Sequence, residues 1–169
     1  RRRADLVQQD PALAKVIGRN DFVWGLVLAK LGRADEALAM LGIIAKNQIR
    51  NWGESDYGTL ERRGFLAIAL ASAGKPQEAL REFGAVVPQL MEQARGDGST
   101  GAASATRKVR MLWIIDGYLQ LLAELRGSPI LQQAGLDAAA QSFTIADFAR
   151  GSEVQRALSA VSARTSVAD

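Results

Sequence analysis

The sequence contains neither cysteine nor histidine. Without them this chain cannot form a disulfide, offer a thiol nucleophile, build the usual zinc site or use imidazole for acid–base chemistry. It also has no apolar run near the ~20 residues that a membrane-spanning helix needs. We therefore expect no metal, no cofactor and no membrane span, and the lack of cysteine leaves the compartment open.

An excess of charge of one sign is almost absent. The chain has 21 Lys and Arg against 18 Asp and Glu, and Arg1, Arg2 and Arg3 account for the whole net charge of +3. A nucleic-acid-binding protein normally concentrates its basic residues on one face, so we expect no nucleic-acid partner. The three arginines are either a handle for an acidic partner or simply a chain end or processing remnant.

What the chain does have favours helices. Of its 169 residues, 48% are hydrophobic and only four are proline. The abundance of alanine and leucine is typical of a mostly helical protein, and the length suits one ordinary core or three to four stacked helical hairpins. The fold class that we predict is all-α.

The chain repeats itself at an interval of 42 residues. The segment Leu31–Leu38 (LGRADEAL) recurs as Ala73–Leu80 (AGKPQEAL), and each copy reads as a helix end, a glycine turn and a helix start. The flanking positions repeat as well: Gly25, Gly32, Ala37, Leu41 and Ile44 in the first copy, Ala67, Gly74, Ala79, Phe83 and Val86 in the second. The small residues predict close helix approach, and the larger ones fill the same face.

This spacing resembles the tetratricopeptide repeat (TPR), in a variant longer than the usual repeat of roughly 34 residues. Ile44 and Val86 stand where the family prefers alanine, and no proline closes either repeat. The resemblance implies a TPR-like helical-hairpin solenoid of about three degenerate repeats with a C-terminal capping helix. The domain organisation that we expect is an N-terminal arm and first helix at 1–18, hairpins at about 20–50, 56–95 and 105–150, a capping helix at about 152–163 and a tail at 164–169.

Several local features refine this picture. Asp56 or Ser55 should cap the helix that follows, and Pro88 should kink or break the fourth helix near Val87. Trp52 and Tyr57 either line a ligand surface or plug the seam between hairpins. The Gly-rich segment 96–101 lacks the ending and the preceding strand of a phosphate-binding loop, so we expect a plain loop.

The third hairpin should begin with a long helix from Ala105 to Arg126. Its expected apolar stripe, with polar interruptions, comprises Val109, Leu112, Trp113, Asp116, Tyr118, Leu119, Leu122 and Leu125. Its basic cluster, Arg107, Lys108 and Arg110, is either a solvated face or a docking patch. After Gly127, taken as the turn, the second helix would place Ala139, Phe143 and Ala146 at the repeat's offsets, with an insertion of seven residues between.

The segment from Ala146 to Arg164 carries the motifs Ala-Arg-Gly and Val-Gln-Arg-Ala-Leu. It resembles the segment behind the TPR helices of bacterial proteins with a CHAT domain, a caspase-like peptidase module. That resemblance implies that a peptidase domain follows Asp169 in a longer protein, of which this chain would be a piece. The simpler interpretation is an amphipathic helix that caps a solenoid, and the two are compatible.

The function that we expect is a non-catalytic scaffold that binds a protein or peptide, as the TPR sensor or recruitment arm of a CHAT peptidase protein. The alternatives are a homo-oligomerisation module or a free-standing TPR adaptor. TPR arrays present the first helix of each hairpin on a concave face, which makes the candidate contacts Asn20, Val23, Trp24, Arg62, Arg63 and Arg110. An enzyme is the remaining possibility, with Asp56, Glu61 and Asp116 as carboxylates, although no motif ties them into a pair.

Overall fold

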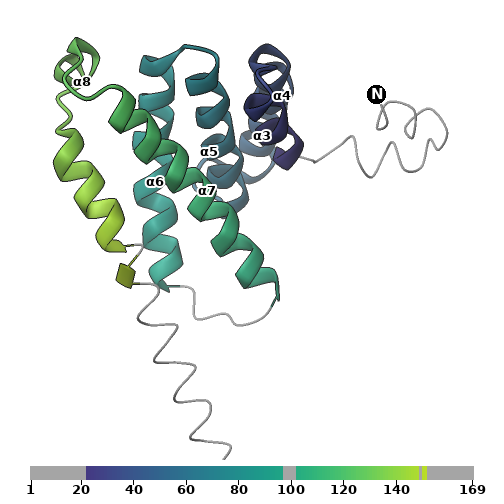
Figure 1. The fold of residues 1–169 in the computed structure, drawn as a ribbon. Helices are drawn as coiled ribbons and strands as arrows, with labels where there is room; N and C mark the ends of the chain where they lie inside the picture. The colour runs from purple at the N-terminus through teal and green to yellow at the C-terminus, as the bar shows by residue number, and fades with distance from the viewer. Residues whose placement is uncertain (1–21, 97–101, 149, 152–169) are drawn as a thin grey trace, which may run out of the picture. The chain divides into compact units, whose positions relative to one another are not determined.

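The computed structural model describes residues 22–96, 102–148 and 150–151, and within them the chain is helical with no strand (Figure 1). The all-α prediction is confirmed for this part of the chain. Residues 1–96 and 97–169 form two compact units, and each is described by itself.

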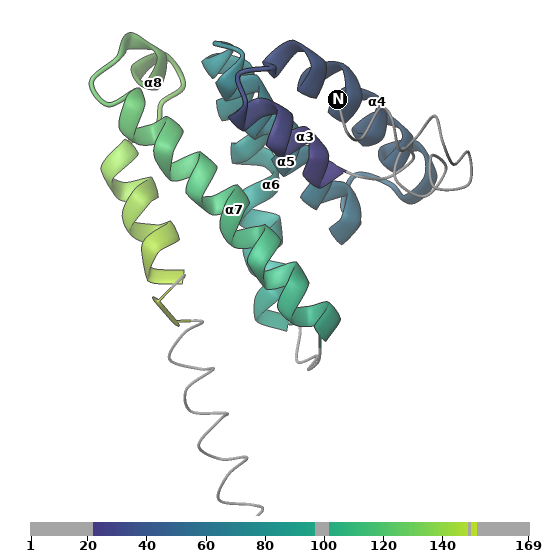
Figure 2. The same ribbon diagram turned by 45° about the vertical axis from the view of Figure 1, so that its right-hand side comes forward.

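The described part of the first unit consists of two helical hairpins. The helices are α3 (Phe22–Lys30), α4 (Ala34–Trp52), α5 (Tyr57–Ser72) and α6 (Pro76–Gly96). Helix α3 packs on α4 and α5 packs on α6, while α5 also packs on both helices of the preceding hairpin (Figure 2). Each hairpin therefore contacts its neighbour in sequence.

The two hairpin turns have the same backbone geometry. Gly32 and Gly74 adopt positive φ values of 74° and 71°, which glycine does without steric cost. The amide N of the residue after each glycine donates to a carbonyl five residues back, from Arg33 to Leu28 at 2.9 Å and from Lys75 to Leu70 at 3.0 Å. This is the six-to-one bond of a Schellman helix end. The predicted glycine turns are confirmed.

The small residues of the repeat lie where helices approach closely. A Cβ atom at Gly25 would come within 2.6 Å of Cγ and Cδ1 of Leu41, so only glycine fits there without a shift. Ala37, Leu41, Ala67, Ala79, Phe83 and Val86 are fully buried. Only Ile44, the counterpart of Val86, is half-buried.

Helix α6 runs through Pro88, so of the kink or break predicted near Val87 the break is wrong. Proline removes a hydrogen bond to the carbonyl four residues earlier, which here belongs to Gly84, an exposed residue that water can hydrate. Val87, Leu90 and Met91 are buried beside the proline. The packing of these three side chains keeps the chain helical, although proline by itself disfavours a helix interior.

The second unit contains α7 (Ala102–Glu124), the short α8 (Pro129–Gln133) and a helix over residues 138–148. Gly127 and Gly135 both have positive φ. The six-to-one bond of the first unit's turns recurs at Gly135, where the Leu136 amide N donates to the Leu131 carbonyl at 3.0 Å. A turn at Gly127 therefore follows α7, as expected, and a second turn at Gly135 precedes the last described helix.

The predicted register of the third repeat is also wrong. Phe143 was assigned to the position of Leu41 and Phe83, yet it is 70% exposed, whereas Ile145 of the same helix is buried. The helix begins at Ala138 and is capped by Asp137, whose Oδ1 accepts hydrogen bonds from the amide N of Ala139 at 2.8 Å and of Ala140 at 3.2 Å. The predicted capping helix at 152–163 and the tail at 164–169 lie outside the described residues.

Candidate functional site

The six predicted contact residues are distributed over both units and over the part of the chain that the structure does not describe. Val23 and Trp24 lie half-buried on α3, and Arg62 and Arg63 lie half-buried on α5. Arg110 is half-buried on α7, in the other unit. Asn20 lies outside the described residues.

Arg62 joins the two hairpins of the first unit. Its Nη1 donates to the Gly58 carbonyl at 2.8 Å, and its guanidinium carbon lies 4.7 Å from the centre of the Phe22 ring. A guanidinium over an aromatic face is attracted by the ring quadrupole. Phe22 in turn meets Phe65 edge to face, with 5.1 Å between ring centres. The cation thus stabilises the contact between α3 and α5.

Arg63 joins helix α5 to helix α6. Its Nε donates to Oε2 of Glu82 at 2.9 Å, and its Nη1 lies 3.8 Å from Oε2 of Glu54 in the segment before α5. Its side chain is only 14% exposed. Replacing Arg62 and Arg63 with glutamate would therefore disturb the packing of the hairpins, so a loss of partner binding in such a variant could not be distinguished from a loss of fold.

The segment between the hairpins is organised by Asp56. Its Oδ2 accepts a hydrogen bond from the amide N of Thr59 at 2.9 Å, which is the N-cap contact of α5. The prediction that Asp56 or Ser55 caps this helix is confirmed, with Asp56 as the cap. The carboxylate proposed for catalysis therefore has a structural role.

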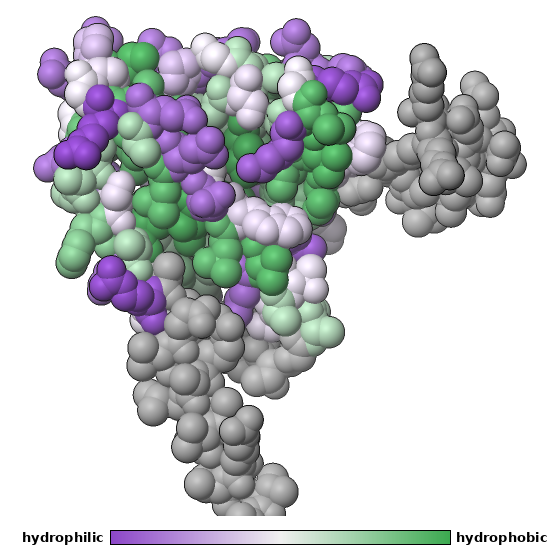
Figure 3. All heavy atoms as spheres, in the orientation of Figure 1, coloured by the Kyte–Doolittle hydropathy of each residue, from purple (hydrophilic) through white to green (hydrophobic). Residues whose placement is uncertain are grey.

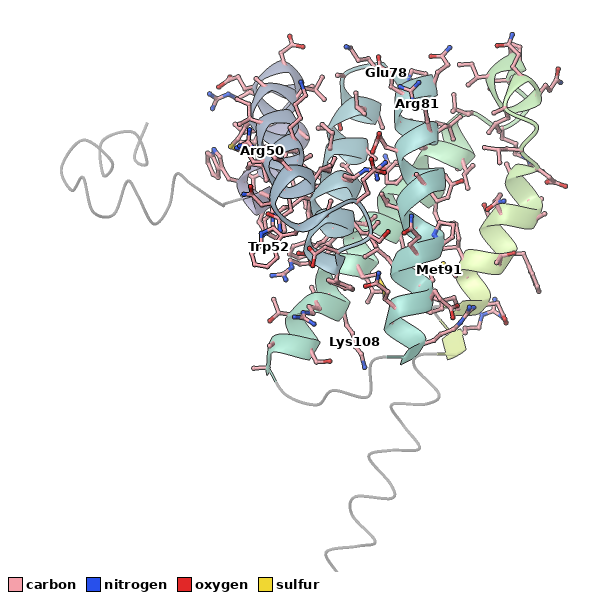
Figure 4. All side chains as sticks on the ribbon, turned by 180° about the vertical axis from the view of Figure 1, so that it is seen from behind. Arg50, Trp52, Glu78, Arg81, Met91 and Lys108 are labelled. Carbon is pink, nitrogen blue, oxygen red and sulfur yellow. The ribbon has the colours of Figure 1, made fainter. Side chains whose placement is uncertain are left out.

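Trp52 does not plug the seam between the hairpins. It ends α4 with 68% of its surface exposed, and it lies with Arg50 along that helix (Figure 4). Tyr57, the other aromatic residue of this segment, is half-buried. For Trp52 the interpretation as a seam residue is wrong.

The two remaining carboxylates considered for catalysis lie in different units of the chain. Glu61 is buried inside the first unit, while Asp116 is exposed on α7 in the second. Within the same residues, no group of three or more His, Cys, Asp or Glu side chains is placed to hold a metal ion. The described helices likewise include none that is both long and apolar enough to cross a membrane.

Helix α7 carries an apolar surface that sequence reasoning assigned to its core. Val109, Leu112 and Trp113 follow the spacing i, i+3, i+4 and are all exposed. Figure 3 shows apolar side chains in the middle of the face it views. The buried side of α7 consists instead of Met111, Ile114, Ile115, Tyr118, Leu121 and Leu122. Most of the predicted stripe is thus out of phase, although Tyr118 and Leu122 are buried as predicted.

The sequence of α7 contains apolar residues on two sides of the helix, but the pattern does not show which side is buried. Apolar residues fill almost every turn of α7 from Val109 to Leu122, so a single helical stripe can be drawn through them in more than one phase. Burial alone distinguishes the two sides. We name the exposed set Val109, Leu112 and Trp113 the α7 apolar face.

Comparisons of this chain with protein-family models, with curated proteins and with solved structures found no match.

Proposed function

We propose that this chain is a non-catalytic scaffold that binds a protein or peptide through the α7 apolar face. The observation that carries the proposal is the exposure of Val109, Leu112 and Trp113 on one side of a helix whose other side is buried. Contiguous exposed apolar residues often mark sites of protein association. Tryptophan is also among the residues that contribute most to binding at interfaces.

The basic residues near this face suggest the chemistry of the partner. Arg107 and Lys108 are exposed and Arg110 is half-buried, and the first acidic residue of α7 is Asp116. The amino-terminal half of the helix is therefore positively charged around apolar side chains. A peptide or helix with apolar anchors and flanking acidic groups complements such a surface.

The architecture that we propose is a TPR-like array. Its support is the hairpin α3–α4, which recurs 42 residues later as α5–α6 with the same helix-end hydrogen bonds and buried small residues. Arrays of this kind present extended surfaces for protein ligands. The role as the sensor or recruitment arm of a CHAT peptidase protein rests on residues 146–164, most of which lie outside the described residues, and it stays a prediction.

The experiment compares two exposed tryptophans. The wild-type chain, Trp113→Ser and Trp52→Ser are immobilised at equal density, and proteins retained from an extract are identified and then titrated individually as purified ligands. We expect a ligand that binds the wild type and Trp52→Ser equally and Trp113→Ser at least about tenfold more weakly, as for an interfacial tryptophan. Equal affinity for all three chains would contradict the role of the α7 apolar face.

Sedimentation equilibrium separates this proposal from the homo-oligomerisation module. A monomer at high concentration excludes self-association as the function. A dimer that Trp113→Ser dissociates would instead assign the α7 apolar face to a second copy of the chain.

A further inference from the structure

The internal repeat allows each residue of α3 to be compared with a counterpart in α5. Val23, Leu26 and Val27 of α3 stand 42 residues before Phe65, Ile68 and Ala69 of α5. The three residues of α5 are buried. Val23 and Leu26 are only half-buried, and Val27 is 37% exposed. We name Val23, Leu26 and Val27 the α3 outer face.

The difference in burial between α3 and α5 follows from the helices that each one packs against. Helix α5 packs on its own partner α6 and also on α3 and α4 of the hairpin before it. Phe65 faces that preceding hairpin, because its ring meets the ring of Phe22. By the symmetry of the repeat, the α3 outer face is the side on which an element preceding α3 would pack. Among the described residues of the first unit, no element precedes α3.

The chain itself offers a segment for this position. Residues 1–21 immediately precede Phe22, and within them Leu13, Val16 and Ile17 follow the spacing i, i+3, i+4 of a helix face. Asp10 and Pro11 provide a helix start, and the four residues 18–21 are Gly, Arg, Asn and Asp, three of which favour turns. We propose that residues 11–17 dock as a helix on the α3 outer face through Leu13, Val16 and Ile17.

The dimensions are compatible with this occupant. A helix of seven residues is about 10 Å long, and the distance along α3 from Val23 to Val27 is about 6 Å. A four-residue connection is within the usual range for antiparallel helices. Since the segment is joined to α3 by that connection, its local concentration at the face exceeds that of any free partner.

The test is a double-mutant cycle in the full chain. Ile17→Asp and Val27→Asp are made singly and together, and Ile43→Asp is the matched control because Ile43 is an exposed apolar residue of α4. All variants carry Trp113→Phe, so that Trp24 and Trp52, both in the first unit, report its unfolding in urea. If a variant fails to fold, the corresponding serine substitution replaces it.

We expect an energetic coupling between positions 17 and 27 and none between positions 17 and 43. The combined variant Ile17→Asp/Val27→Asp should raise the unfolding equilibrium constant about tenfold less than the product of its single effects, because either change already abolishes the docked contact. When Ile17→Asp is combined with Ile43→Asp, the unfolding equilibrium constant should rise by the product of the two single effects. Independent effects at positions 17 and 27 would overturn the proposal.

Sedimentation velocity provides the second readout. A self-association that Val27→Asp abolishes and Ile17→Asp leaves intact would overturn the proposal in favour of a second copy on the α3 outer face. A monomer with coupled positions 17 and 27 supports docking of residues 11–17. This inference is independent of the α7 apolar face, so each can fail without the other.

Discussion

Replacing Gly25 with alanine tests the close contact between α3 and α4. A Cβ atom at this position would lie 2.6 Å from Cγ and Cδ1 and 2.8 Å from Cδ2 of Leu41, a fully buried side chain. Because Cγ is among the contacted atoms, rotation of the terminal methyl groups cannot relieve the conflict. Either Leu41 must leave its place or the two helices must separate.

The expected free-energy change combines two opposing contributions. Alanine is favoured over glycine in a helix interior by about 1 kcal/mol. Overpacking of a tight core costs about 1–3 kcal/mol. A net destabilisation of about 1 kcal/mol follows, and in a chain of this size it lowers the melting temperature by about 2–4 °C.

Gly84→Ala is the matched control. Gly84 lies inside α6, and no neighbouring atom comes within 4 Å of a Cβ placed there. This variant gains the same helix propensity without a clash, so it should be more stable than wild type by up to about 1 kcal/mol. The difference between the two variants isolates the overpacking cost.

The assay is urea unfolding followed by the fluorescence of Trp24 and Trp52 in a Trp113→Phe background. Gly25→Ala should shift the midpoint to lower urea and Gly84→Ala to higher urea. In a Leu41→Ala background, which removes the contacted atoms, Gly25→Ala should also become stabilising. Equal stabilisation by Gly25→Ala and Gly84→Ala in the wild-type background would refute the close approach of α3 to α4.

Three further predictions concern single side chains. Asp56→Ala should cost about 1 kcal/mol of stability in urea unfolding through loss of the α5 cap, and Asp56→Asn should restore most of it; equal losses in both would contradict the cap. The hydrogen bond from Arg33 lowers the pKa of Glu36 below 4.5. The stability that this pair contributes is therefore present above the unfolded pKa of Glu36 and is lost as pH falls through its folded pKa. Arg33→Gln should return the pKa of Glu36 toward 4.5 in an NMR titration, and an unchanged pKa would contradict the pairing. Burial raises the pKa of Tyr118 above 10.0, so stability should fall as pH rises past the unfolded value, and a titration at 295 nm should lose its late step in Tyr118→Phe.

The parts of the fold that the sequence predicted are those governed by local rules. Gly32 and Gly74 end helices because positive φ is cheap only for glycine, and Asp56 caps α5 because its short carboxylate reaches the Thr59 amide. The buried alanines followed from helical spacing. These signals operate within a few residues, so a single sequence contains them.

The parts that the sequence could not predict depend on tertiary contacts. Pro88 stays helical because packing around it outweighs its local preference. Arg62 and Arg63 were expected on a binding face, but their partners are Phe22 on α3 and Glu82 on α6, 40 residues before and 19 residues after them. For the candidate site, the pattern identified α7 as apolar, and only burial separated Val109 from Met111.

The nearest-neighbour packing of the first unit has a consequence for how it folds. Every extensive contact among its described helices joins elements that are adjacent or next but one along the chain. Such a topology has a low contact order, so the entropy lost in closing loops is small and folding times of microseconds to milliseconds are typical. Since α5 and α6 make the most extensive contacts, their hairpin is the natural nucleus. The first hairpin would then fold onto the α5–α6 hairpin, and among the described helices of this unit unfolding would start at α3.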